Sequence, residues 1–239
     1  MTGFAADRMV LRGVRVLKGL GLRLGVGLVL VATATGAAPV SAPLQDPATP
    51  QSETMSPEVL AIGQVVTAAE LAAWGRRRGD PGALILAARM LGEVPMRQGE
   101  GEAAFLTPDR LLDEAAALSL GQPAWLDAIE RVREHGLRGV DSSPFGEGPI
   151  FTVKEVRARA VYGFEVEARG GEVLRVAAIG DGDTNIDLSM RDDQGSVLCR
   201  DGSGDHYPVC TVVPRQAGRV RIDIINRGDI WTKVQILSN

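Results

Sequence analysis

The chain has 239 residues, of which 23% are charged and 45% hydrophobic, and its formal net charge is −4. This composition is typical of a globular protein and excludes wholesale disorder and a membrane protein with several spans. Only 4% of the residues are aromatic, so few rings are present to stack on bases, and we expect no nucleic-acid partner.

The first 42 residues have the layout of a secretory signal peptide. Basic side chains up to Arg23 precede an apolar run from Leu24 to Ala32, which is followed by small residues ending at Ala42. This order predicts cleavage and export to the periplasm or the extracellular space. The alternative is an uncleaved signal, the one membrane contact we expect, although about 17 apolar residues barely span a bilayer. Without this segment the formal net charge is −8, because it holds five basic side chains and one acidic one.

Residues 43–55 are rich in Pro, Thr, Ser and Gln, which predicts a flexible linker. Residues 56–140 predict a helical unit instead. Four helices are expected, because a proline near the first position of a helix recurs with apolar residues at helical spacing behind it. The expected starts are Pro57, Pro81, Pro108 and Pro123, and glycines at 79, 121 and 136 are expected to end the first, third and fourth helices.

This helical unit has two interpretations. Its two hairpins could form a peptide-binding groove, as in helical-repeat proteins, or they could be a packing unit without a ligand. No repeat period is visible, which favours the packing unit. Trp74 and Trp125 are spaced like core residues, and the basic run from Arg76 to Arg78 is expected to be solvated at the end of the first helix.

The segment 141–148 is rich in serine and glycine and contains Pro144, which predicts a hinge, and residues 149–239 change character. Apolar and polar residues alternate over about eight short segments, which is typical of half-buried strands. The sequence therefore predicts an α+β protein of two domains, a small four-helix unit followed by an all-β, jelly-roll-like sandwich. The alternating residues include Phe164, Val166, Leu174, Val176, Ile186, Leu188, Val220, Ile222, Trp231 and Val234.

Several motifs in this part occur in the order found in a known family. They are the run from Gly180 to Leu188, the Asp193-Gln194-Gly195 turn, Cys199 and Cys210, Pro214, the run from Gly218 to Ile222, and Asn226-Arg227-Gly228. Residues 150–238 thereby resemble the bacterial pre-peptidase C-terminal domain, whereas the helical part resembles no family that we recognise. The resemblance implies a secreted, usually non-catalytic β-sandwich, which in some members binds calcium or a polymeric protein.

Cys199 and Cys210 are the two cysteines of the chain. In an exported protein such a pair predicts one disulfide between neighbouring strands. The alternatives are free thiols or a metal site with His206, which an oxidising compartment disfavours.

Asp181, Asp183 and Asp187 alternate in a way that resembles a calcium loop. A helix-loop-helix site is excluded, because Ile186 stands where the sharp turn needs glycine. Two interpretations stay open. One is a looser calcium site formed by Asp181 and Asp183 with Asp187 or a backbone carbonyl. The other is a turn made by Asp and Gly residues, in which Asp187 accepts backbone hydrogen bonds at a strand edge. We expect no other cofactor.

No known catalytic motif accompanies His135 or His206, and the carboxylates of Glu165 and Glu167 are expected to be solvated. The sequence therefore favours an exported, non-catalytic binding or accessory protein, whose sandwich attaches to a protein or an envelope polymer that the sequence does not identify. The alternative is an enzyme with a carboxylate site between the helical unit and the sandwich. A loose hinge at 141–148 argues against a shared site.

Overall fold

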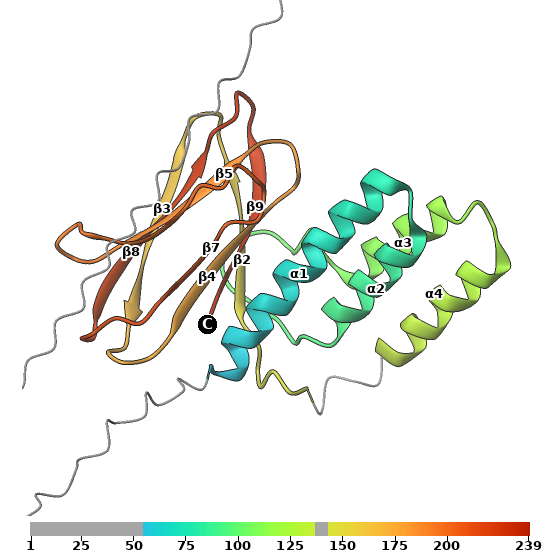
Figure 1. Cartoon of the computed structure of the whole chain (residues 1–239), viewed down its shortest axis with the longest axis horizontal. Coiled ribbons are helices and arrows are strands. Elements are labelled where there is room, and N and C mark those ends of the chain that lie inside the picture. Colours follow the sequence, from blue (N-terminus) through green and yellow to red (C-terminus); the bar gives the residue numbers. More distant parts are fainter. Residues whose placement is uncertain (1–54, 137–142) are drawn as a thin grey trace, which may run out of the picture. The chain divides into compact units, whose positions relative to one another are not determined.

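Helices come first along the chain and a β-sandwich follows, which confirms the predicted α+β layout (Figure 1). The structure is a computed structural model that describes residues 55–136 and 143–239. The predicted signal peptide and nearly all of the predicted linker lie outside the described residues. The elements are α1 Pro57–Arg78, α2 Pro81–Gly92, β1 Arg97–Gln98, α3 Pro108–Leu118, α4 Pro123–Gly136, β2 Ile150–Val156, β3 Val161–Ala168, β4 Leu174–Gly180, β5 Ile186–Arg191, β6 Val197–Asp201, β7 Val209–Val212, β8 Gly218–Asn226 and β9 Thr232–Ser238.

The helix starts are determined locally. The side chains of Ser56, Asp80 and Thr107 each accept a hydrogen bond from the backbone N–H three residues further on, and a proline follows each of them. These caps satisfy donors that a helix start leaves unpaired. Gly79, with φ 63°, ends α1 as predicted. The third helix ends at Leu118, three residues before the predicted glycine.

Two sheets form the sandwich. The first sheet has the strand order β1-β2-β9-β4-β7, and the second has the order β3-β8-β5-β6. All neighbouring strands are antiparallel except β1 and β2. The period-two alternation therefore predicted the inner faces correctly. The buried residues between the sheets include Val176, Ala178, Val234 and Ile236 from the first sheet and Ile186, Leu188, Met190, Val220, Ile222 and Ile224 from the second.

The helices cover the other face of the first sheet. Phe151, Val153, Ala177, Ile179 and Leu237 point away from the sandwich core and share one apolar cluster with residues of the helices. Helix α1 contacts both β4 and β9 (Figure 1). The first sheet is consequently buried on both faces, while the second sheet has a polar outer face.

The expectation of a loose connection between helices and sandwich is wrong for the described residues, which all belong to one unit. Residues 141 and 142 of the predicted hinge lie outside them, but the rest is held in place: Ser143 Oγ donates a hydrogen bond to the Glu93 carbonyl at 2.9 Å. Phe145 packs against the shared apolar cluster. Apolar contacts over one face of the first sheet join the helices to the sandwich, and these contacts prevent the loose connection that the predicted hinge implied. None of the described helices is both long enough and apolar enough to cross a membrane.

Candidate functional site

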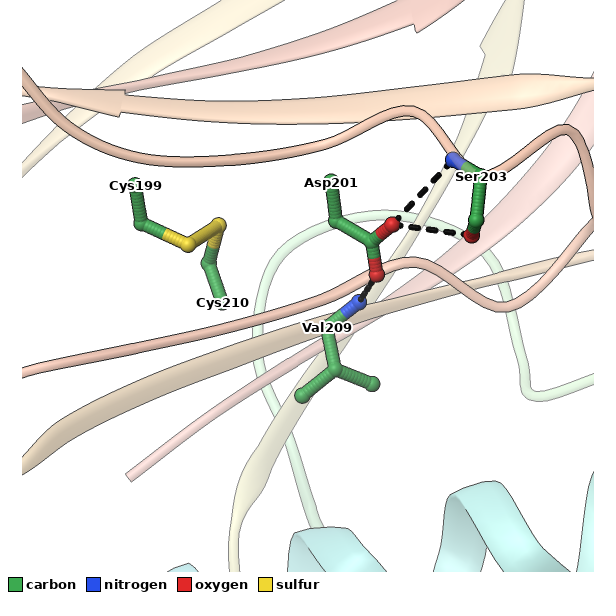
Figure 2. Close-up of a disulfide and its surroundings, with 5 residues drawn as sticks. All are labelled: Cys199, Asp201, Ser203, Val209 and Cys210. Carbon is green, nitrogen blue, oxygen red and sulfur yellow. Dashed lines mark hydrogen bonds between the residues drawn. A yellow bond between two sulfur atoms is a disulfide. The ribbon is translucent and has the colours of Figure 1, made fainter. Parts of the chain in front are cut away.

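The disulfide is formed as predicted, and it joins the two sheets (Figure 2). Cys199 lies on β6, the edge of the second sheet, and Cys210 lies on β7, the edge of the first. Beside it, Asp201 Oδ2 accepts a hydrogen bond from the Val209 N–H at 2.8 Å, and Asp201 Oδ1 accepts one from Ser203 Oγ at 2.9 Å. The disulfide and the carboxylate of Asp201 together join β6 and β7, the edge strands of the two sheets.

The three carboxylates proposed for calcium are not brought together as a site. Asp181 Oδ1 accepts a hydrogen bond from Thr232 Oγ1 at 2.6 Å, and Oδ2 accepts one from the Lys233 N–H at 2.9 Å. Asp187 instead pairs with Arg227. Among the described residues no group of three or more His, Cys, Asp or Glu side chains is arranged to hold a metal ion. Asp181 accepts a backbone hydrogen bond, as a structural role in the turn requires, whereas Asp187 pairs with an arginine side chain instead of the backbone donors expected for it. Calcium binding stays a prediction.

Asp187 is the most buried carboxylate of the polar outer face. Its side chain is only 6% exposed, and Arg227 Nη2 lies 2.6 Å from Oδ2, with Arg200 Nη2 at 3.5 Å. Two guanidinium groups thus offset the cost of burying this charge. On the same sheet Glu165 pairs with Arg219 at 3.3 Å, so this carboxylate serves an exposed ion pair.

A pocket of about 520 Å³ lies at one end of the sandwich, where the β2–β3, β4–β5 and β8–β9 connections meet. We call it the tryptophan pocket. Ile230 and Trp231 are 53% and 50% exposed there, so two large apolar side chains face solvent at one place. The lining residues are Arg157, Ala158, Asp183, Asp229, Ile230 and Trp231.

The loop that carries Ile230 and Trp231 is held by hydrogen bonds to the side chain of Asn226, which is 1% exposed. Its Nδ2 lies 3.1, 3.2 and 2.7 Å from the carbonyl oxygens of Val156, Arg157 and Ile230. Its Oδ1 accepts a hydrogen bond from the Gly228 N–H at 2.8 Å. A single buried amide therefore connects two of the loops around the tryptophan pocket.

The first residues of β9 are held in the same way. Asp181 fixes Thr232 and Lys233 as described above, and Lys233 Nζ also pairs with Glu102 at 2.6 Å, which raises the pKa of Lys233. Asp229, which lines the pocket, also forms an ion pair with Arg159 at 2.7 Å. The exposed indole of Trp231 thus stands next to backbone that is held on both sides.

A second and larger cavity lies on the helices. Its volume is about 920 Å³, and its lining is mostly apolar. We call it the helical groove. Its lining residues come from α2 and its C-cap, from α3 and from α4, and are Gly82, Ile85, Leu86, Ala88, Arg89, Gly92, Glu93, Pro108, Asp109, Leu112, Trp125, Ala128, Arg131, Val132, Arg133 and His135.

Two of the three tryptophans differ from their predicted roles. Trp231 is not part of the last strand, which begins at Thr232, and Trp74 is 43% exposed, with the Arg78 guanidinium 5.9 Å from its ring centre. Trp125 is partly buried and packs against the apolar cluster, as its spacing predicted, and it also lines the helical groove. The Asn226-Arg227-Gly228-Asp229 turn before Trp231 was a local sign that the strand starts later.

The alternative enzyme site was expected between the helical unit and the sandwich. Between the helices and the first sheet the described residues form an apolar cluster, and Gln235 Oε1 there accepts a hydrogen bond from the Leu106 N–H at 3.3 Å. The histidines lie elsewhere: His206 Nδ1 contacts the Thr184 carbonyl oxygen, and His135 Nδ1 contacts that of Arg131. Near His206, burial raises the pKa of Tyr207.

No protein-family model matches the sequence, and no curated protein matches it either. Solved structures that match include the pre-peptidase C-terminal domain of a Bacillus anthracis collagenase, with 3% identity over 37% of this chain and 88% of that one, at a TM-score of 0.32. Another is PliG, a periplasmic inhibitor of g-type lysozyme from Aeromonas hydrophila, with 12% identity over 38% and 86% and a TM-score of 0.28. A carbohydrate-binding module of Cellvibrio mixtus lichenase 5A has 12% identity over 35% and 72%, at a TM-score of 0.24. At these values membership in the pre-peptidase family stays a prediction.

Proposed function

We propose that this protein is an exported, non-catalytic binding or accessory protein, which attaches to a protein or a polymer of the cell envelope through the tryptophan pocket of its sandwich. The observation that carries the proposal is the pair of half-exposed side chains Ile230 and Trp231 at one end of the sandwich. Large apolar side chains that are exposed together mark interaction sites more often than scattered single ones do.

The support beneath the loop adds to this argument. Tryptophan is enriched among the residues that dominate binding energy, and a side chain held before binding loses less conformational freedom when the partner arrives. Asn226 and Asp181 hold the backbone on both sides of Trp231. Asp183 and Arg157 lie on the rim of the pocket, where polar contacts to a partner add specificity.

Export is supported by two features of the chain. The first 42 residues have the order expected of a signal peptide, and the Cys199–Cys210 disulfide requires an oxidising compartment to form and persist. Cell fractionation with mass spectrometry of the mature protein tests this part. A chain found in the cytoplasm with its first 42 residues intact contradicts export.

The binding part is tested with Trp231→Ala. Immobilised mature protein is exposed to the envelope fraction of its own cells, with and without calcium, and the retained partners are identified and quantified. We expect Trp231→Ala to lose a partner that the native protein retains, at a cost of about 2 kcal/mol or more in binding free energy. Trp74→Ala is the matched control, since this tryptophan is comparably exposed on α1. Equal retention by all three proteins refutes the role of the pocket.

A further inference from the structure

The backbone around the tryptophan pocket excludes one common mode of binding. Every residue that lines the pocket lies in a connection between strands, and no edge strand contributes to the lining. An extended peptide that adds a strand to a sheet needs the unpaired N–H and C=O groups of an edge strand. The pocket therefore does not fit a ligand that binds by strand addition.

The apolar part of the pocket is small. Ile230 and Trp231 are its two large apolar residues, and they are consecutive in the sequence. An amphipathic helix needs a groove that accepts several apolar side chains about one turn apart, and a proline-rich segment docks in a groove lined by several aromatic rings. One indole beside one aliphatic side chain instead fits a single ring-sized group.

The charges at the rim of the pocket balance. Asp229 is paired with Arg159 at 2.7 Å. Asp183 and Arg157 are exposed, and neither forms an ion pair within the described residues. The rim thus offers one carboxylate and one guanidinium without an excess of either charge. This balance favours a neutral ligand with hydrogen-bond donors and acceptors over a phosphate or another strongly charged group.

The carboxylate and the indole are held next to each other by Asp181. Its Oδ1 accepts a hydrogen bond from the Asp183 N–H at 3.4 Å and another from Thr232 Oγ1 at 2.6 Å. Thr232 directly follows Trp231 in the chain. One buried network therefore fixes the backbone of a polar group and of an aromatic ring on the same side of the pocket, which lowers the cost of ordering both on binding.

A sugar combines the features that this pocket accepts. The C–H groups on one face of a pyranose ring form an apolar surface that packs on the face of an indole. The hydroxyl groups around the ring both donate and accept hydrogen bonds, so they donate to the carboxylate of Asp183 and accept from the guanidinium of Arg157. The volume of about 520 Å³ also lies in the range of small-ligand pockets.

We infer that the tryptophan pocket binds a neutral pyranose unit of a glycan, with the sugar ring on Trp231 and its hydroxyl groups hydrogen-bonded to Asp183 and Arg157. The inference rests on the proposed function, because it names the ligand class of the same pocket.

The inference is tested by NMR titration of the mature protein with two soluble probes, the β-1,4-linked trimers of glucose and of N-acetylglucosamine. We expect saturable shifts of the Trp231 indole signal and the Asp183 amide signal, with a dissociation constant of about 1 mM. Shifts with both trimers indicate recognition of the ring and its hydroxyl groups, and shifts with the acetylated trimer alone place its methyl group against Ile230. The three indole signals are assigned by substitution of each tryptophan.

The variants separate the sugar from other ligands. Trp231→Ala, followed through the Asp183 amide, should bind at least roughly tenfold more weakly, whereas Trp74→Ala should bind as the native protein does. Asp183→Asn should bind about fivefold more weakly, because its amide is a weaker acceptor than the carboxylate. Asp193→Asn is the matched control, since this exposed carboxylate lies in the β5–β6 turn outside the pocket.

The inference is overturned if neither trimer shifts the two signals at about 10 mM, which is tenfold above the expected dissociation constant. It is also overturned if Asp183→Asn binds as tightly as Asp193→Asn, or if a proline-rich peptide shifts the signals and the trimers do not. The proposed function survives each of these results as long as Trp231→Ala loses an envelope partner in the retention experiment. The two failures are therefore distinguishable.

Discussion

The disulfide offers the sharpest test of how the sandwich is held together. Strand β6 is the outermost strand of the second sheet, and most of its side chains are exposed. Its pairing with β5 contains an irregularity between Met190 and Arg191. The strand therefore depends on its covalent bond to β7 and on the hydrogen bonds of Asp201 more than on apolar burial.

The expected loss can be worked out from the geometry. The bond joins residues 11 apart in the sequence. Opening a loop of this size restores unfolded-state entropy worth about 3 kcal/mol in the chain-entropy model. Because the carboxylate of Asp201 still joins β6 to the start of β7, we expect the sandwich to persist and β6 to loosen first.

The assay compares three proteins in urea unfolding: the native chain, the native chain kept reduced, and Cys199→Ala with Cys210→Ala. Alanine is preferred to serine because Cys210 is fully buried and a hydroxyl there lacks a partner. We expect both altered forms to lose about 3 kcal/mol, with faster amide exchange in β6 before the rest of the sandwich. A loss below about 0.5 kcal/mol, or uniform exchange over all strands, refutes this account of the open edge.

Four other expected outcomes concern single residues. Asn226→Ala removes the amide that joins the loops around the tryptophan pocket. We expect about 2 kcal/mol lower stability in urea unfolding and a less ordered Trp231 signal by NMR. An unchanged Trp231 signal contradicts the role of Asn226. Asp187→Ala leaves the Arg227 guanidinium without its buried partner and should cost about 2 kcal/mol in the same measurement, whereas an unchanged midpoint shows that this pair does not stabilise the second sheet. Burial raises the pKa of Tyr207 above 10.0, so the native state holds this proton more tightly than the unfolded state. The resulting stability is present below pH 10.0 and is lost as the pH rises through the native pKa. Tyr207→Phe should flatten that decline in alkaline unfolding experiments. Because Asp181 and Asp187 are already engaged, we expect millimolar calcium to leave the melting temperature unchanged, whereas a saturable rise that Asp183→Asn abolishes revives the calcium site.

Much of the architecture was predictable because it depends on neighbours in the sequence. The caps Ser56, Asp80 and Thr107 act over three residues, and the prolines behind them restrict the same turn of helix. Strand alternation is also local, since successive side chains point to opposite faces. These patterns predicted the four helices and the inner faces of β3, β4, β5, β8 and β9, whereas β1 lies within the segment predicted to be helical.

The candidate sites were predicted less well. Asp181, Asp183 and Asp187 are close in sequence, yet the strand directs Asp187 to the outer face of the second sheet, while Asp181 holds the start of β9. Trp231 was expected within a strand, and only its position beside Asp229 and Arg157 shows that it lines a pocket. Neither cavity is formed by residues of one segment alone.

Local patterns in the chain were sufficient to predict most of its elements and its cysteine pair, because caps and alternation act on residues close together. Export, which the same kind of pattern indicates, stays a prediction. Which surfaces are covered depended on contacts between distant segments. Ala177, Ile179 and Leu237 are apolar on the second face of their strands, but only the packing of α1 explains why that face is buried. The exposed Trp231, the open helical groove and the edge-to-edge disulfide all follow from such long-range packing, which the order of residues alone does not specify.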